Sequence, residues 1–205
     1  MKKIIAMLLA LTLAVGLVAC ANNGGDNTTT GQTTQTTEGT TSEETVGELV
    51  ATTKALEIMT TIWNALPAEQ KFPVMGGDAN HMVDGAPGLH SLTDEGILYT
   101  MLVPEAEVAN IDEAATMVNA MMINNFCGGV YHVTGDAKAF AEAMHGAIST
   151  NRWMCGMPEK MVIAIIDGEY VLAMYGLNDF VNALETEMGK AYTNVQTLYS
   201  EAITE

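Results

Sequence analysis

Two apolar runs separated by Asp167-Gly168 constrain the fold of this chain more than any other feature. The runs 161–166 (MVIAII) and 169–175 (EYVLAMY) are rich in aliphatic, β-branched and aromatic residues. Asp-Gly between two such runs is typical of a β-hairpin with a type I′ turn, because both central positions of that turn require positive φ. We therefore expect an antiparallel strand pair here and regard it as central to folding.

Helices and a further strand are predicted before this hairpin. The spacing of apolar residues predicts a helix from Val46 to Leu66, ended by Pro67, and a strand from Gly96 to Val103. Pro104 begins a second predicted helix, whose inward face comprises Val108, Ile111, Ala115, Val118 and Met122. Residues 72–91 contain four glycines and two prolines, so we expect a loop there.

The C-terminal half continues the alternation of helices and strands. A short strand is predicted over Val130–Thr134, and Asp136 is a suitable N-cap for a helix with Phe140, Met144 and Ile148 on one face. A last helix is predicted from Leu177 to Leu198. This order predicts an α+β fold, a two-layer sandwich with helices on one face of a small, largely antiparallel sheet.

The N-terminus resembles the signal of bacterial lipoproteins. Lys2 and Lys3 precede an apolar stretch over 4–18 that is too short to span a bilayer core about 30 Å thick. The run 17–20 (LVAC) resembles a lipobox. The resemblance implies that residues 1–19 are a cleaved signal peptide and that Cys20 becomes an acylated N-terminus carrying palmitate or similar chains. Two or more chains anchor a protein stably, here at the outer face of the cell membrane.

Residues 20–45 are predicted to be a disordered, Thr-rich tether. From Ala21 to Thr45 the chain has no aromatic residue and no aliphatic residue larger than alanine, so burial cannot offset the entropy of ordering the backbone. A glycosylated stalk is the alternative to a passive spacer. Residues 46–205 then have the length of one domain.

Charge limits the partners of the chain. Lys2 and Lys3 belong to the signal, which leaves six Lys and Arg against 25 Asp and Glu. Nucleic acid is excluded as a partner because phosphate binding depends on clustered Lys and Arg. The same charge disfavours docking onto anionic lipid, so the expected membrane contact is the lipid on Cys20.

A family resemblance extends over most of residues 49–175. The run 151–155 (NRWMC), the 161–175 hairpin, the helix around 56–63 and the run 72–76 (FPVMG) resemble small lipoproteins of unknown function from Gram-positive gut anaerobes. In that family the first run usually reads Asn-Pro-Arg-Lys-Trp, and this chain lacks the proline and the lysine. The resemblance implies a common fold and a surface location, and it implies no activity.

Catalytic motifs are weak throughout the sequence. The four serines lie outside any Gly-x-Ser-x-Gly elbow, and no glycine-rich phosphate loop joins a strand to a helix. A glycosidase-type pair of carboxylates stays open, because the fold and not a local motif places it. A Cys127–His132 nucleophile is a further alternative without a family-type signature.

The residues 75–90 suggest metal chemistry as another alternative. Met75, His81, Met82 and His90 offer thioether and imidazole ligands, which suit copper. Met59, Met122, Met144, Met174 and Met188 fall at expected core positions, where methionine is an adaptable filler. Asp78, Asn80 and Asp84 weakly resemble a calcium loop, but Leu89 stands where a bidentate glutamate is needed. We therefore predict no metal site and no cofactor.

Cys127 and Cys155 leave two possibilities open. Each precedes a predicted strand, so a disulfide at one end of the sheet is possible. Exported cysteines of anaerobes are often reduced, however, and we favour free thiols that behave as small apolar side chains.

These observations predict a membrane-anchored, extracytoplasmic lipoprotein that is not an enzyme. Its domain is expected to bind an unknown protein or small ligand through a Gly-rich loop that includes Gly76, Gly77, Asp78, His81 and His90. The alternatives are an enzyme acting on cell-wall or peptide material and a carrier of copper or another metal.

Overall fold

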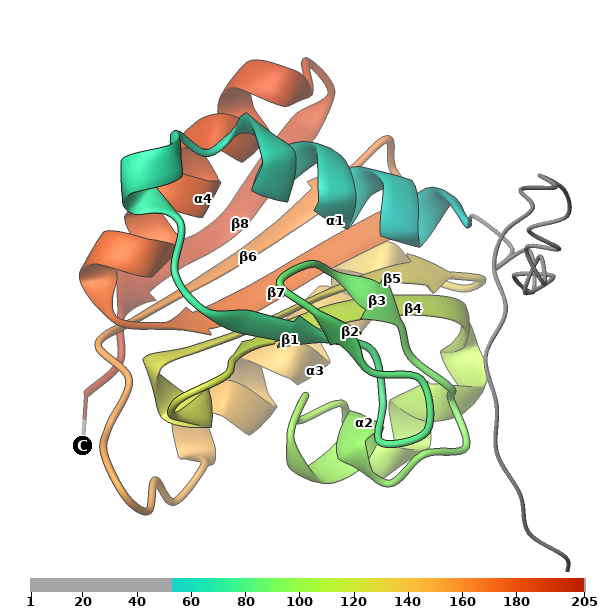
Figure 1. The fold of residues 1–205 in the computed structure, drawn as a ribbon. Coiled ribbons are helices and arrows are strands. Elements are labelled where there is room, and N and C mark those ends of the chain that lie inside the picture. The colour runs from blue at the N-terminus through green and yellow to red at the C-terminus, as the bar shows by residue number, and fades with distance from the viewer. Residues whose placement is uncertain (1–52, 205) are drawn as a thin grey trace, which may run out of the picture. The chain divides into compact units, whose positions relative to one another are not determined.

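The computed structural model describes residues 53–204, which form an open antiparallel sheet with helices on both sides (Figure 1). The predicted signal peptide, Cys20 and the predicted tether lie outside the described residues. None of the helices in residues 53–204 has the length and apolar character needed to cross a bilayer.

The sheet is built around the hairpin expected at Asp167-Gly168. Strands β6 (Lys160–Ile166) and β7 (Tyr170–Gly176) pair from Lys160 opposite Gly176 to Ile166 opposite Tyr170. The turn residues Asp167 and Gly168 have φ values of 54° and 85°. Positive φ at both positions is what a type I′ turn requires, so the hairpin prediction is confirmed.

Six further strands extend this pair on both sides. The strand order is β2-β1-β4-β5-β7-β6-β8, with β3 also paired to β4, and every pairing is antiparallel. Their bounds are β1 (Val74–Gly76), β2 (Val83–Asp84), β3 (Gly88–Leu89), β4 (Ile111–Asn119), β5 (Phe126–Val133) and β8 (Val195–Ala202).

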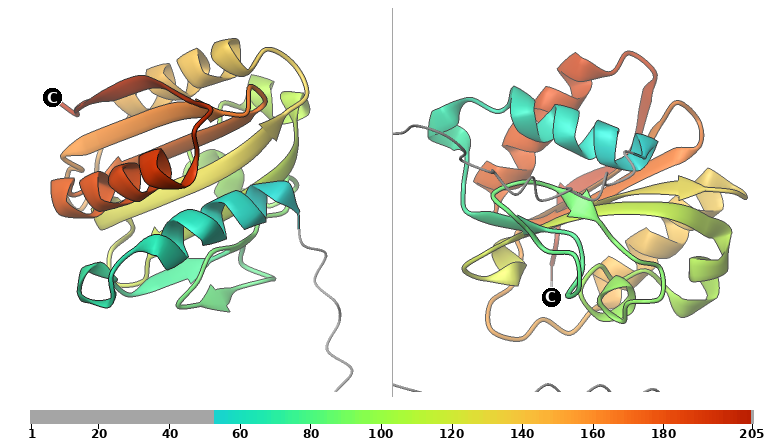
Figure 2. Two further views of the ribbon diagram at one scale, coloured as in Figure 1. Left: turned by 90° about the horizontal axis from the view of Figure 1, so that it is seen from above. Right: turned by 45° about the vertical axis from the view of Figure 1, so that its right-hand side comes forward.

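Helices cover both faces of the sheet. Figure 1 shows α1 (Lys54–Ala65) and α4 (Asn178–Ala191) on one face and α3 (Ala137–Thr150) with the short α2 (Gly96–Tyr99) on the other, and Figure 2 shows the same layers from above. Side chains of β6 and β7 alternate between the two cores: Val162 and Leu172 pack with α1 and α4, whereas Ile163 and Val171 pack with α3. Alternating residues of a strand point to opposite faces.

The α+β class and the antiparallel sheet are confirmed, and the distribution of the helices differs from the expected single face. The reason lies in the hairpin, whose residues 161–166 and 170–176 are buried without exception. Strands that are apolar on both sides must be covered on both sides. A continuous apolar run predicts two covered faces, whereas helices on one face would require polar residues at every second position.

Two predicted helices agree with the structure over most of their length. Helix α1 ends before Pro67, and the Thr53 hydroxyl at its N-terminus accepts a hydrogen bond from the Leu56 amide at 3.3 Å. Helix α3 begins after Asp136, whose carboxylate accepts hydrogen bonds from the amides of Lys138 and Ala139. Phe140, Met144 and Ile148 of α3 are buried, as its apolar spacing predicts.

Four other predictions are wrong. The strand expected over 96–103 is the short helix α2, and the loop expected over 72–91 contains β1, β2 and β3. The helix expected after Pro104 is a short 3₁₀ turn (η2, Glu105–Asn110) followed by strand β4. The helix expected to reach Leu198 ends at Ala191 and is followed by β8. Both faces of β4 are covered, with Ile111 in one core and Ala115 in the other, so apolar residues from both faces recur at helical spacing and did not distinguish a strand from a helix.

The hairpin turn generates a stability prediction. A Cβ on Gly168 would meet no atom within 4 Å, so its substitution tests backbone conformation alone. Gly168→Val is expected to lower the free energy of unfolding by about 1–2 kcal/mol, because a β-branched residue at positive φ is strained. Urea denaturation measures this change.

Gly135→Val is the matched control. Gly135 is also exposed and free of contacts, but it is not at positive φ. Equal stability of the two variants would contradict the turn assignment.

Candidate ligand pocket

The segment 76–90 is packed tightly against the edge of the sheet. Strand β1 pairs with β4, and β3 pairs with the neighbouring part of β4. A Cβ on Gly76 would lie 2.3 Å from the Ala86 carbonyl oxygen, and one on Gly77 would lie 2.2 Å from the His81 carbonyl oxygen. Both glycines predicted to belong to a ligand loop are therefore required for the close approach of its backbone, and neither lines the cavity described below.

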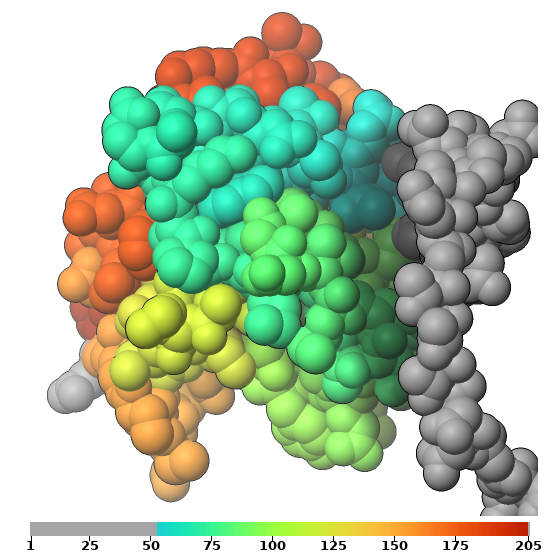
Figure 3. All heavy atoms as spheres, in the orientation of Figure 1, coloured from blue at the N-terminus to red at the C-terminus, as the bar shows by residue number. Residues whose placement is uncertain are grey.

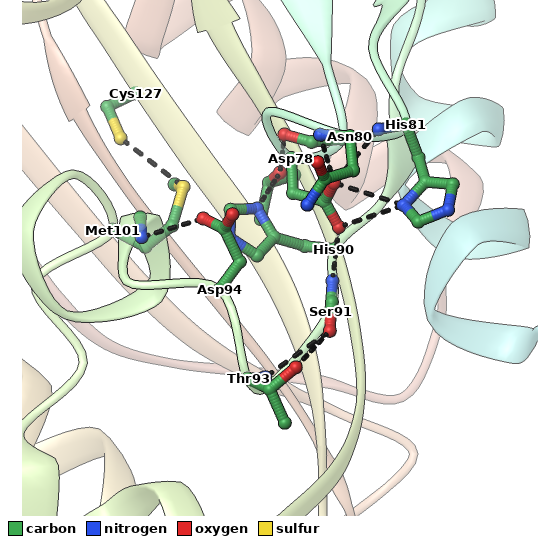
Figure 4. Close-up of polar contacts among 12 residues, drawn as sticks. Asp78, Asn80, His81, His90, Ser91, Thr93, Asp94, Met101 and Cys127 are labelled. Carbon is green, nitrogen blue, oxygen red and sulfur yellow. Dashed lines mark hydrogen bonds and ion pairs between the residues drawn. The ribbon is translucent and has the colours of Figure 1, made fainter.

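Asp78 organises this segment from within. Its carboxylate accepts hydrogen bonds from the amides of Asn80 (2.8 Å), His81 (2.9 Å) and Ser91 (2.8 Å), and the His81 ring lies 3.1 Å from the same group. Figure 4 shows these interactions converging on one side chain. Asp78 is only 4% exposed. Burial alone would raise its pKa, but the hydrogen bonds from Ser91, Asn80 and His81 outweigh burial and lower the pKa below its ordinary value.

His90 fixes the other end of the segment. Its amide donates to the Ala114 carbonyl on β4, and its Nδ1 lies 2.9 Å from the Thr116 hydroxyl. Thr116 donates to the Gly77 carbonyl at 3.2 Å, so its oxygen accepts from Nδ1–H of His90. The Nε2 of His90 is buried without a hydrogen-bond partner, and Asp94 lies 3.6 Å away. Burial lowers the pKa of His90 and favours the neutral ring.

A cavity of about 560 Å³ lies beside this framework. Its walls come from three parts of the chain: the segment 78–92, the start of β4 and the residue before α1. Most of the exposed wall is apolar, and the lining residues are Thr53, Asp78, His81, Met82, Val83, Leu89, His90, Ser91, Leu92, Asp112, Glu113 and Ala114. The volume lies in the range of small-molecule sites in proteins.

The acidic residues that line the cavity each have an internal partner. Asp112 pairs with the His132 ring, and this hydrogen bond raises the pKa of His132. Glu113 accepts a hydrogen bond from the Ala55 amide at 3.2 Å, at the N-terminus of α1. The positive end of the helix dipole favours a carboxylate at that place. Together with Asp78, these carboxylates hold the walls of the cavity in position.

Only part of the predicted ligand loop forms the cavity. Asp78, His81 and His90 line it together with Met82, whereas Met75 does not. The carboxylate of Asp78 is occupied by backbone amides, which argues against the calcium loop considered for Asp78, Asn80 and Asp84. Residues 53–204 contain no group of three or more His, Cys, Asp or Glu side chains arranged to hold a metal ion.

The two cysteines are free thiols, so the alternative of a disulfide is not realised in the structure. Cys127 is buried and donates to the Thr100 carbonyl at 3.3 Å, and burial raises its pKa to about 12. Cys155 is exposed. His132 lies an odd number of residues from Cys127 on β5 and therefore points to the opposite face, which rules out the Cys127–His132 nucleophile.

Sequence reasoning missed the contribution of β4 to the cavity. Asp112, Glu113 and Ala114 line it, but they fall within the predicted helix after Pro104. A useful signal was present in the run 111–119 (IDEAATMVN), where the β-branched residues Ile111, Thr116 and Val118 recur.

Asp78 provides a prediction for this site. Asp78→Ala is expected to lower the free energy of unfolding by about 2–4 kcal/mol, because three backbone amides lose the buried carboxylate that accepts their hydrogen bonds. The carboxylate with a lowered pKa stabilises the fold above about pH 4, and this contribution is lost as the pH falls through the folded-state value. The variant should therefore lose less stability on acidification than the wild type.

Urea denaturation between pH 3 and 7 measures both effects. Asp84→Ala is the matched control, because Asp84 is an exposed aspartate of the same segment. A variant Asp78→Ala that is as stable as Asp84→Ala at pH 7 would show that the buried carboxylate does not hold the segment.

Comparisons with known proteins identify no relative on which to base a function. Searches against protein-family models, curated proteins and solved structures found no match to the chain. The function must therefore be argued from the geometry of residues 53–204 and from the sequence before them.

Proposed function

We propose that this protein is a membrane-anchored, extracytoplasmic binding protein whose domain takes a small ligand, or one side chain of a peptide, without catalysis. The cavity beside residues 78–92 is the binding site. The observation that carries the proposal is an apolar cavity whose ionisable lining residues are all engaged in internal contacts.

The apolar wall of the cavity would stabilise a bound ligand through burial of apolar surface. Met82 is 64% exposed and Val83 is 39% exposed, and Leu89 and Leu92 lie beside them in the lining. Covering a side chain of this size contributes about 1.5–3 kcal/mol. A ligand with an apolar body would therefore gain free energy by covering this wall.

The charges around the cavity restrict the polar part of the ligand. Asp78, Asp112 and Glu113 are acidic, and the lowered pKa of His90 keeps its ring neutral. A negative group would be repelled at such a site. The arrangement favours a neutral or cationic ligand.

The internal contacts of the lining residues support binding without catalysis. A general acid or base must reach the proton that it transfers. Asp78 and Glu113 instead accept backbone hydrogen bonds, Asp112 is bound to His132, and His90 is bound to Thr116. We infer that these groups shape the cavity.

The location rests on the N-terminal sequence. Leu17-Val18-Ala19-Cys20 and the Thr-rich residues 20–45 support a lipid anchor followed by a tether. A tether of this kind keeps the domain concentrated near the membrane. Mass spectrometry of the mature protein tests the anchor: acyl chains on an N-terminal Cys20 are expected, and an unmodified Cys20 would contradict it.

Met82→Glu tests the site. We expect NMR titration with apolar dipeptide amides, which are neutral or cationic, to shift the amides of residues 78–92 and 112–114. The variant should weaken the binding of any such ligand about tenfold to 100-fold, because it loses apolar contact and adds a negative charge. Met121→Glu is the matched control, since Met121 is 81% exposed and lies outside this cavity.

Three outcomes would contradict the proposal. Binding that Met82→Glu and Met121→Glu weaken equally would place the ligand elsewhere. Turnover of a muropeptide or peptide that Asp112→Asn abolishes would make the protein an enzyme. Binding of Zn(II) or Cu(II) that is lost in both His81→Ala and His90→Ala would make this cavity a metal site.

A further inference from the structure

A second surface of the domain gathers sulfur-containing side chains that sequence analysis did not connect with one another. Met121 is 81% exposed, Met154 is 78% exposed and Met122 is 46% exposed. These residues and the exposed Cys155 line one cavity of about 460 Å³. Residues 119–124 and 154–155 are far apart in the sequence, and Figure 3 shows the two segments, yellow and orange, side by side.

Hydrogen bonds hold the two segments together. The Asn124 side-chain amide donates to the carbonyls of Met154 and Gly156, both at 2.7 Å. These carbonyls lie on either side of Cys155. In the segment 119–124, the side-chain oxygen Oδ1 of Asn119 accepts hydrogen bonds from the backbone amides of Met121 and Met122 and fixes the local backbone conformation.

The backbone brings the Met122 thioether close to the turn at Cys155. Cys155 has a φ of 62° and Gly156 a φ of 117°, so the chain turns sharply at the thiol. A Cβ built on Gly156 would lie 3.6 Å from Sδ of Met122. The thioether of Met122 therefore packs against the residue next to Cys155.

We propose that this surface, which we call the Met/Cys site (Met121, Met122, Met154 and Cys155), binds one Cu(I) ion. The thiolate of Cys155 and the thioethers are soft ligands of the kind that selects Cu(I). Binding displaces the thiol proton to solvent, forms a copper–sulfur bond and changes no oxidation state.

The other lining residues explain the choice of metal. They are Asn119, Ala120, Ile123 and Asn124, so the cavity offers no carboxylate and no imidazole. Hard ions such as Ca²⁺ and Mg²⁺ need oxygen ligands, and Zn²⁺ sites in proteins use several thiolates, imidazoles or carboxylates. One thiolate with several thioethers suits a soft monovalent cation better than any of these ions.

The Met/Cys site is separate from the ligand cavity. The cavity uses Asp112 to Ala114 at the start of β4, whereas the Met/Cys site begins at Asn119 at its end. Six residues of extended chain between Glu113 and Asn119 correspond to about 20 Å. The inference therefore does not depend on the function proposed for the cavity, and the copper set of Met75, His81, Met82 and His90 plays no part in it.

Anaerobic titration with Cu(I) tests the proposal. The full-length protein carries Cys20→Ser, so that Cys127 and Cys155 are its only thiols, and bicinchoninate competes for the metal. We expect one Cu(I) per chain. Loss of a residue that only positions a metal ligand weakens metal binding roughly 10–100-fold. Cys155→Ser removes a ligand itself and should weaken binding by more than this. The double variant Met121→Leu/Met154→Leu should weaken it about tenfold or more.

Two control variants and methyl NMR spectra distinguish Cu(I) binding at this site from binding at other thiols and thioethers. Cys127→Ala and Met82→Leu should bind Cu(I) as the parent does, because Cys127 is buried and Met82 lies in the other cavity. In methyl NMR spectra, Cu(I) or its redox-inert analogue Ag(I) should shift the signals of Met121, Met122 and Met154 and leave that of Met82 in place. Cys155 and the three methionines are exposed or partly exposed, so these variants are expected to fold.

The proposal is overturned if the protein does not withdraw Cu(I) from its bicinchoninate complex, or if Cys155→Ser binds as tightly as the parent. It is also overturned if binding depends on His81 or His90, which would place the metal in the ligand cavity. Methyl shifts confined to methionines other than Met121, Met122 and Met154 would also overturn it.

Discussion

The burial of the β6–β7 hairpin on both faces determines the rest of the structure. Residues 161–166 and 170–176 are buried throughout, so the hairpin needs an apolar layer on each side. Helices α1 and α4 supply one layer, and α3 with the segment around α2 supplies the other. The remaining strands extend the sheet on either side of the hairpin, and both of its faces are packed against apolar side chains.

Strand β4 runs from the apolar cavity to the Met/Cys site. At its start, Asp112 and Glu113 line the apolar cavity while they bind His132 and the N-terminus of α1. At its end, Asn119 shapes the segment that carries Met121 and Met122. The segment 76–90 reaches the same strand through β1 and β3 and is held from within by Asp78. These polar contacts therefore position both of the surfaces for which we propose ligands.

The parts of the fold that the sequence predicts are those with a local cause. The hairpin follows from Asp167-Gly168, and the start of α3 follows from Asp136. The predictions for β4 and for the end of α4 were wrong because apolar residues from both faces of a strand can recur at helical spacing: Ile111 and Ala115 lie in different cores, as do Val195 and Leu198. The same difficulty hid Asp112 and Glu113 from the predicted site, while Asp78, His81 and His90 were found in the Gly-rich segment. The Met/Cys site could not be predicted from the sequence, because only the tertiary fold brings residues 121–124 and 154–155 together.

Native-state hydrogen exchange tests most directly whether the two-sided hairpin supports the domain. The amides of Val162–Ile166 and Val171–Met174 are expected to exchange only through global unfolding, more slowly than those of α1, α3 and α4. The amides of His81 and Ser91 should be protected as well, although they lie outside strands, because the Asp78 carboxylate binds them. Hairpin amides that exchange through a local opening, at a lower free energy than the helices, would contradict this account.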